Sequence, residues 1–255
     1  TYLNDVNLDI VNSRVEFIGK LLDKDIAKGK IDVSQKDAAM SRLIPSVSLE
    51  DAKDCDIVVE AIVENMEIKT STFRKLDEVC KPGCILASNT SSLPITEIAA
   101  VTKRPEKVIG MHFMNPVPVM KLVEIIRGIA TSDETYEAVR DLSVELNKTP
   151  VEVRDVPGFV SNRVLQMMIN EAIYCLYEGV ASVEDIDAVM KLGMNHPMGP
   201  LQLADFIGLD TVLAIMEVMY EGYADCKYRP CPLLRQYVKA GWLGKKAGRG
   251  FYSYE

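Results

Sequence analysis

The sequence is poor in several residues and patterns that mark common classes of protein. It has only two histidines, and its six cysteines include no Cys-x-x-Cys pair, so we expect neither a metal centre nor a disulfide framework. No apolar run reaches the ~18 residues that a membrane span needs, and the N-terminal residues lack the hydrophobic stretch of a signal peptide. These absences favour a cytoplasmic protein with reduced thiols that does not enter a membrane.

An excess of positive charge is also lacking. The formal net charge is −8, which argues against nucleic acid or an anionic membrane surface as the partner. With 255 residues, of which 48% are hydrophobic, the chain can bury the cores of two compact domains. Cys80 and Cys84 flank a Lys-Pro-Gly turn, and we interpret them as small half-buried residues rather than a redox pair.

Strand, loop and helix alternate over the first part of the chain. Residues 1–5 resemble the end of a strand and lead into a long amphipathic helix, and residues 56–63 form a continuous apolar run followed by a helix over 68–80. Further strands are expected at 83–87, 108–113 and 149–153. This alternation predicts an α/β fold with a parallel, Rossmann-like sheet over residues 1–154.

Only helical patterns follow residue 154. Apolar residues recur at helical spacing over 165–176, 185–192 and 201–220, which predicts an all-helical second domain over residues 155–255. Its apolar surface suggests self-association into a homodimer, although a single helical core explains the pattern equally well. His196 lies in a turn rich in proline and glycine, where we expect a structural role.

One histidine and one glutamate form the strongest candidate for chemistry. His112 lies near the end of the 108–113 run, and Glu124 lies among the apolar residues of Val123-Glu124-Ile125-Ile126. A carboxylate in such surroundings needs a partner, and His112 is the natural one. The carboxylate would fix the imidazole tautomer, so that the other ring nitrogen could accept a proton from a hydroxyl. The alternative is a Glu124 that points to solvent from an edge strand.

Five motifs occur in an order that resembles the L-3-hydroxyacyl-CoA dehydrogenase family over essentially the whole chain, with the closest likeness to its bacterial short-chain members. They are Ser-Asn-Thr-Ser-Ser-Leu (88–93), Ile-Gly-Met-His-Phe-Met-Asn-Pro (109–116), Pro-Gly-Phe-Val-Ser-Asn-Arg (157–163), Asn-His-Pro-Met-Gly-Pro (195–200) and Gly-Arg-Gly-Phe-Tyr (248–252). The resemblance implies interconversion of a short-chain (S)-3-hydroxyacyl-CoA, such as 3-hydroxybutyryl-CoA, with its 3-oxoacyl-CoA.

The same resemblance assigns roles in catalysis. It makes His112 the acid/base and Glu124 the carboxylate that orients it, with the Ser91 hydroxyl and the Asn162 amide holding the substrate near the reacting centre. Neutral donors of this kind stabilise developing alkoxide character without a fixed cation. Without the resemblance, Ser91 and Asn162 would be read as residues that cap helices.

Cofactor residues are likewise implied by the resemblance. Asp5 matches the acidic residue that accepts hydrogen bonds from the ribose and repels a 2′-phosphate, which favours NAD over NADP. The positions implied near the nicotinamide half of the dinucleotide are Glu64, Lys69, Ser91, Asn115 and Lys246. Lys24 and Lys28, one turn apart on the first helix, are candidates for the phosphates of coenzyme A, although each lysine taken alone would be a solvated surface charge.

No Gly-x-Gly-x-x-Gly motif occurs in the sequence. We therefore expect the family's first strand, its glycine-rich turn and the helix that binds the pyrophosphate to be missing ahead of Tyr2, leaving two unpaired strand edges. A fragment, an N-terminal part that is disordered or lies outside this sequence, and a partner or swapped segment that fills the gap are all compatible with this. Two other functions also stay open: a related dehydrogenase of a free hydroxy acid or sugar acid, and a non-catalytic structural or binding homodimer.

Overall fold

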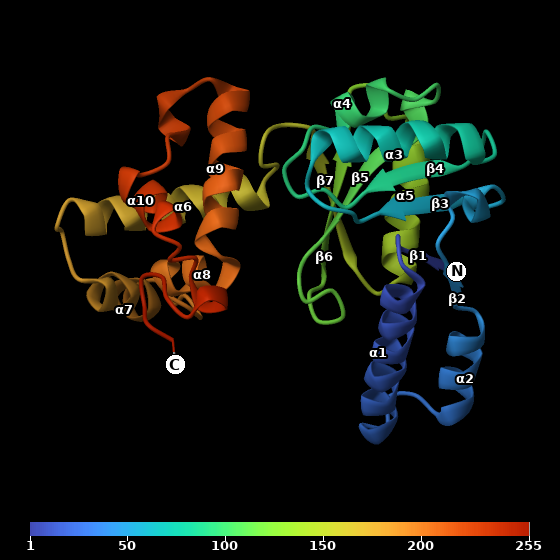
Figure 1. The fold of residues 1–255 in the computed structure, drawn as a ribbon, viewed down its shortest axis with the longest axis horizontal. Helices are drawn as coiled ribbons and strands as arrows, with labels where there is room; N and C mark the ends of the chain where they lie inside the picture. The colour runs from blue at the N-terminus through green and yellow to red at the C-terminus, as the bar shows by residue number, and fades with distance from the viewer. Residues whose placement is uncertain (255) are drawn as a thin grey trace.

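The computed structural model describes residues 1–254; Glu255, the last residue of the predicted second domain, lies outside the described residues. The chain forms two bodies joined by a short turn, with the sheets in one and helices in the other (Figure 1). The larger sheet contains β3 (Ile57–Glu60), β4 (Ile85–Ser88), β5 (Val108–Phe113), β6 (Leu122–Arg127) and β7 (Thr149–Arg154), in that spatial order. No helix of the described residues is long and apolar enough to cross a membrane.

Strand direction changes once in this sheet. β3, β4 and β5 are parallel, as predicted, but β6 runs antiparallel to β5, and β7 is parallel to β6. The reversal was not predicted from the strand-helix alternation. Only residues 114–121 separate β5 from β6, and a parallel connection needs a crossover of roughly a dozen residues or more.

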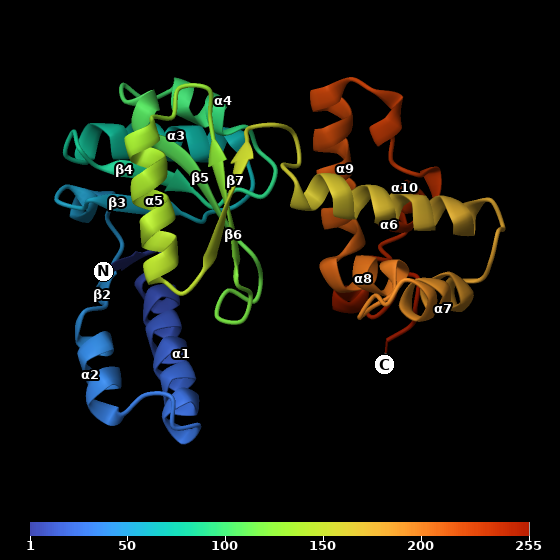
Figure 2. The same ribbon diagram turned by 180° about the vertical axis from the view of Figure 1, so that it is seen from behind.

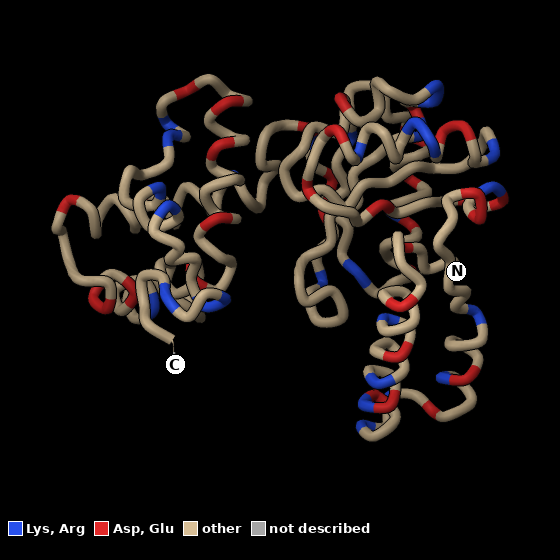
Figure 3. The backbone as a smooth tube through the Cα atoms, in the orientation of Figure 1, with Lys and Arg blue, Asp and Glu red and all other residues tan. Residues whose placement is uncertain are grey.

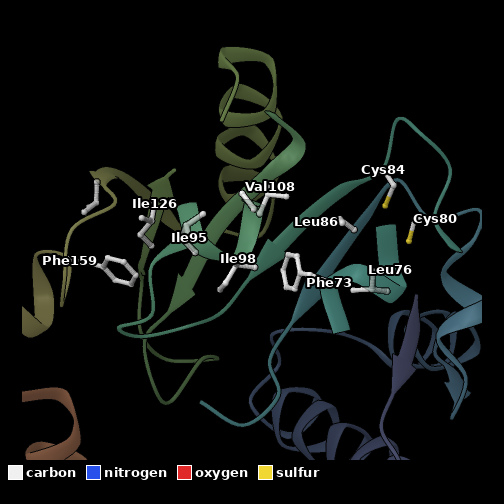
Figure 4. Packing of buried hydrophobic residues seen from close by; sticks show 12 residues of the cluster. Phe73, Leu76, Cys80, Cys84, Leu86, Ile95, Ile98, Val108, Ile126 and Phe159 are labelled. Carbon is white, nitrogen blue, oxygen red and sulfur yellow. The ribbon is translucent and has the colours of Figure 1, made fainter. Parts of the chain in front are cut away.

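Helices cover both faces of the sheet. α3 (Met66–Val79) and α4 (Ile95–Ala100) lie on one face and α5 (Asp133–Glu145) on the other, as the two opposite views show (Figures 1 and 2). The core under α3 and α4 joins Phe73 and Ile98 to Leu86, Val108 and Phe159 (Figure 4). The alternate residues of the strands face α5, where Ile109, Met111 and Val123 pack with Val139.

The N-terminal residues form a separate unit. β1 (Tyr2–Asn4) and β2 (Ile44–Ser46) make a two-stranded parallel sheet of their own, so β3 lies at an edge of the five-stranded sheet. Between them, α1 (Leu8–Ala27) and α2 (Val33–Ser41) form a hairpin that projects away from the sheet (Figure 1). The N-cap Asn7 accepts the Asp9 N–H at the start of α1, which satisfies one free helix donor.

The second body contains α6 (Ser161–Tyr177), α7 (Val183–Gly193), α8 (Pro200–Ile207), α9 (Leu209–Tyr223) and α10 (Pro232–Lys239). The single helix predicted over 201–220 was wrong, because Gly208 breaks it with a φ of +101°. Only glycine adopts that backbone conformation readily. Buried Asp205 accepts hydrogen bonds from the backbone of Phe251 and Tyr252, which fixes the C-terminal segment to α8.

Candidate active site

The antiparallel pairing of β5 and β6 brings His112 and Glu124 together. They are register partners in the ladder, and His112 Nδ1 lies 2.9 Å from Glu124 Oε2. Glu124 is only 2% exposed and His112 8% exposed, so the alternative of a solvent-facing Glu124 is wrong. Among the hydrogen bonds of residues 1–254, the imidazole is bound only through Nδ1, which leaves Nε2 for a substrate hydroxyl.

Glu124 is held as a carboxylate by donors from two sides. Besides His112, the Ser161 backbone N–H donates to Oε1 at 3.0 Å, and the Ser161 hydroxyl donates to Oε2 at 2.8 Å. Burial alone raises the pKa of Glu124, but the hydrogen bonds from His112 and Ser161 outweigh it, and the pKa lies below its ordinary value. The pair is therefore a buried imidazole beside an ionised acid.

The loop after β4 is organised around Glu64. Its Oε1 accepts hydrogen bonds from the Thr90 hydroxyl at 2.6 Å and from the Ser91 N–H and hydroxyl at 2.9 and 3.2 Å. Burial raises the pKa of Glu64, but the interactions with Thr90, Lys69 and the Ser91 N–H lower it by more. The pKa of Glu64 therefore lies below its ordinary value. At the other side of the loop, Asn89 Oδ1 accepts the N–H of Phe113, the residue after His112.

Behind Glu64 lies a buried cation. Lys69 is only 1% exposed, so the reading of this lysine as a solvated charge was wrong. Its ammonium lies 2.7 Å from Glu60 and 3.4 Å from Glu64, and Glu60 also accepts the Ser88 hydroxyl at 2.7 Å. Glu60 was not a candidate in the sequence; its place at the carboxyl end of β3 was the available signal.

Asn162 connects the two bodies. It is the second residue of α6, whose N-cap Val160 makes no side-chain bond, and its Nδ2 donates to the Ser91 carbonyl at 2.8 Å. Ser91 does not cap a helix either, because its hydroxyl reaches Glu64. The first turn of α6 therefore contacts both the acid-base pair, through Ser161, and the Ser91 loop, through Asn162.

A cleft of about 310 Å³ opens between the Ser91 loop and α9. Glu64 and Ser91 line one side, and Asp210 and Thr211 line the other; His112 is not among the lining residues. Lys246 pairs with Asp210 at 2.6 Å and thus lies beside this cleft. A larger hollow, of about 460 Å³, is lined by α7 alone and contains none of the candidate residues.

The remaining candidates are exposed and are not joined to this cluster by hydrogen bonds of the described residues. Asp5 follows β1, and its Oδ1 accepts the Val6 N–H at 2.7 Å. Asn115 lies two residues beyond β5. Lys24 lies in the last turn of α1 and Lys28 is its C-cap, on a hairpin where acidic and basic residues are mixed (Figure 3).

Comparisons with known proteins agree with this geometry. Residues 1–156 match the family model described as 3-hydroxyacyl-CoA dehydrogenase, NAD binding domain, and residues 158–254 match that for the C-terminal domain. The chain is 65% identical to a probable 3-hydroxybutyryl-CoA dehydrogenase of Bacillus subtilis, covering 98% of this chain and 88% of the relative. It is 55% identical to the 3-hydroxybutyryl-CoA dehydrogenase of Bradyrhizobium diazoefficiens, covering 99% and 86%. The crystal structure of (S)-3-hydroxybutyryl-CoA dehydrogenase from Ralstonia eutropha superimposes with a TM-score of 0.97 at 51% identity, over 100% of this chain and 90% of that one.

Proposed function

Because the chain belongs to the 3-hydroxyacyl-CoA dehydrogenase family, we propose that His112 and Glu124 perform its acid-base chemistry beside the Ser91 loop. The chain is an NAD-dependent oxidoreductase that interconverts a 3-hydroxyacyl-CoA and a 3-oxoacyl-CoA. Relatives that are 55% and 65% identical are named for 3-hydroxybutyryl-CoA, so the short-chain pair is 3-hydroxybutyryl-CoA and acetoacetyl-CoA. The observation that supports the site best is the buried His112–Glu124 contact.

The residues present fit the ribose and nicotinamide parts of a dinucleotide, whereas the glycine-rich turn that binds the pyrophosphate is not among them. Asp5 offers an exposed carboxylate directly after β1, where ribose hydroxyls are bound in Rossmann-like sheets. Glu64, Ser91 and Lys246 lie in or beside the cleft between the two bodies, and Lys69 lies directly behind Glu64. We assign these residues and Asn115 to NAD. When bound there, NAD would supply the hydride acceptor, and NADH the hydride donor, for substrate C3.

The proton is handled by the chain itself. Glu124 accepts the Nδ1–H of His112, which leaves the Nε2 lone pair free to accept a proton. In the oxidation direction Nε2 takes the proton of the C3 hydroxyl, and in the reduction direction it returns it. Asn162 has a second Nδ2–H for the substrate oxygen, and the Ser91 hydroxyl donates to that oxygen by leaving its 3.2 Å contact with Glu64. We propose that Lys24 and Lys28 bind the phosphates of coenzyme A.

The test of this function is the oxidation of NADH by acetoacetyl-CoA, followed at 340 nm. His112→Gln should reduce turnover by ~10² to 10⁴ and leave the affinity for acetoacetyl-CoA within a few fold. Adding Glu124→Gln should cost much less than the two single losses combined, because both act through one imidazole. Turnover of a free hydroxy acid instead would favour the related dehydrogenase. Tight dimers without turnover would favour the non-catalytic role.

We also propose that the chain is a homodimer joined through its helices, with residues 1–154 as the cofactor domain and 155–255 as the substrate and dimerisation domain. Apolar side chains on α6, α7 and α8 are exposed: Val164 is 67% exposed, Leu192 87% and Phe206 64%. Sedimentation at micromolar concentration should give a dimer, and Leu192→Asp with Phe206→Asp should give a monomer. A wild-type protein that sediments as a monomer would contradict this proposal.

We place the enzyme in the cytoplasm. All six cysteines are free thiols, and burial raises the pKa of Cys84 to about 12, so this thiol stays protonated and inert. Such cysteines suit a reducing compartment.

A further inference from the structure

Ser161 makes a double contact with the carboxylate of the acid-base pair. It is the first residue of α6, and it offers Glu124 both its backbone N–H, at 3.0 Å from Oε1, and its hydroxyl, at 2.8 Å from Oε2. The hydroxyl thus reaches the same oxygen that faces His112 Nδ1 at 2.9 Å.

These contacts decide how Glu124 is held. Glu124 is 2% exposed, and its donors among residues 1–254 are His112 and the two groups of Ser161. The other neighbours give no help, because the ladder places apolar Val151 of β7 beside it, and the titratable group that acts on it is His112. Arg163, two residues after Ser161 on α6, does not pair with Glu124, because its guanidinium lies over the Tyr223 ring.

We propose that Ser161 is a positioning residue of the dehydrogenase: its hydroxyl keeps Glu124 Oε2 ionised and aimed at Nδ1 of His112. The proposal rests on the proposed function of that pair. Since Ser161 begins α6 and Asn162 of the same turn donates to the Ser91 carbonyl, it follows that the acid-base pair is complete only while the first turn of α6 stays against Glu124.

The consequence is a change in the pH profile rather than a simple loss of stability. Without the hydroxyl, the negative charge on Glu124 is less satisfied, so the pair binds its first proton more readily, whichever group carries it. A hydrogen bond to a charged group is worth enough to shift a titration by about one unit of pH, and the retained backbone N–H limits the shift.

The experiment compares Ser161→Ala, Ser161→Thr and Ser71→Ala with the wild type over pH 5 to 9. For Ser161→Ala we expect the acid limb of kcat/KM to move up by about half a unit to one unit, kcat to fall about tenfold at pH 7, and KM for acetoacetyl-CoA to stay within twofold. Ser161→Thr keeps a hydroxyl and should restore the wild-type limb. Ser71 is an exposed serine that bonds only to its own helix, so its variant should match the wild type.

The outcomes separate this inference from the proposed function. If His112→Gln is inactive but Ser161→Ala keeps the wild-type acid limb, the inference is wrong and the proposed function stands, even if Ser161→Ala unfolds more easily. If His112→Gln turns over normally, the proposed function itself fails. As a second readout, the His112 Nδ1–H proton should give a downfield NMR signal that shifts in Ser161→Ala and returns in Ser161→Thr; an unmoved signal would also overturn the inference.

Discussion

Replacing the buried Lys69 by methionine should be far more destabilising than replacing an exposed lysine of the same helix. Lys69 lies 2.7 Å from Glu60 and 3.4 Å from Glu64, and the side chains of Lys69 and Glu60 are 1% and 2% exposed. Removing one partner of a buried ion pair leaves the other charge uncompensated and costs about 3 to 5 kcal/mol. Glu64 is 35% exposed and remains partly solvated, so we expect Lys69→Met to lower the free energy of unfolding by about 3 kcal/mol, the lower end of this range.

The matched control is Lys75→Met on α3, where the ion pair with Glu50 at 2.8 Å joins side chains that are 48% and 64% exposed. Such a surface pair is worth less than about 1 kcal/mol. Urea unfolding followed by far-UV circular dichroism measures both losses, provided that the slope of the transition is unchanged. Adding Glu60→Gln to Lys69→Met should recover at least half of the loss, because it removes the stranded charge. If Lys69→Met costs no more than Lys75→Met, the account of this network is wrong.

Two further predictions concern pH and the start of α6. Glu124 and Glu64 both have pKa values below the ordinary carboxyl value, so the stability that they contribute is present above that value and is lost as the pH falls through the lowered one. Unfolding by urea between pH 6 and 3 should therefore show a smaller pH dependence in Glu124→Gln than in the wild type. Burial raises the pKa of Asp205, which changes stability with pH in the opposite direction, but it does so equally in the variant and the wild type. An equal pH dependence of the two proteins would contradict the reasoning. Gly158→Ala should destabilise the protein more than Gly179→Ala: both glycines have a φ of +74°, but only at Gly158 would a Cβ meet a neighbour, the Met219 sulfur at 2.7 Å. The strain common to both is about 1 to 2 kcal/mol, and equal melting temperatures for the two variants would show that the contact with Met219 is irrelevant.

Local sequence patterns determined most of the secondary structure and pointed to His112 and Glu124, whereas the other candidate residues came from the family resemblance. The strands predicted at 108–113 and 149–153 correspond to β5 and β7, and the helix predicted over 68–80 corresponds to α3 within two residues at either end. Apolar periodicity and turn residues act over a few residues, so they can be read without the fold. The need of Glu124 for a partner also followed from its apolar neighbours alone.

Contacts between distant residues were decided only by the tertiary structure. The reversal between β5 and β6 places Glu124, near the start of β6, opposite His112, near the end of β5. In a parallel pair with the strand ends aligned, Glu124 would lie opposite Gly110, two residues away from the partner of His112. Lys69 looked like a surface charge until the packing of α3 against the sheet buried it beside Glu60. Ser161 gave no signal in the sequence, because its importance comes from the docking of α6 on Glu124. Register and burial depend on the whole chain, so no local pattern of residues contains them.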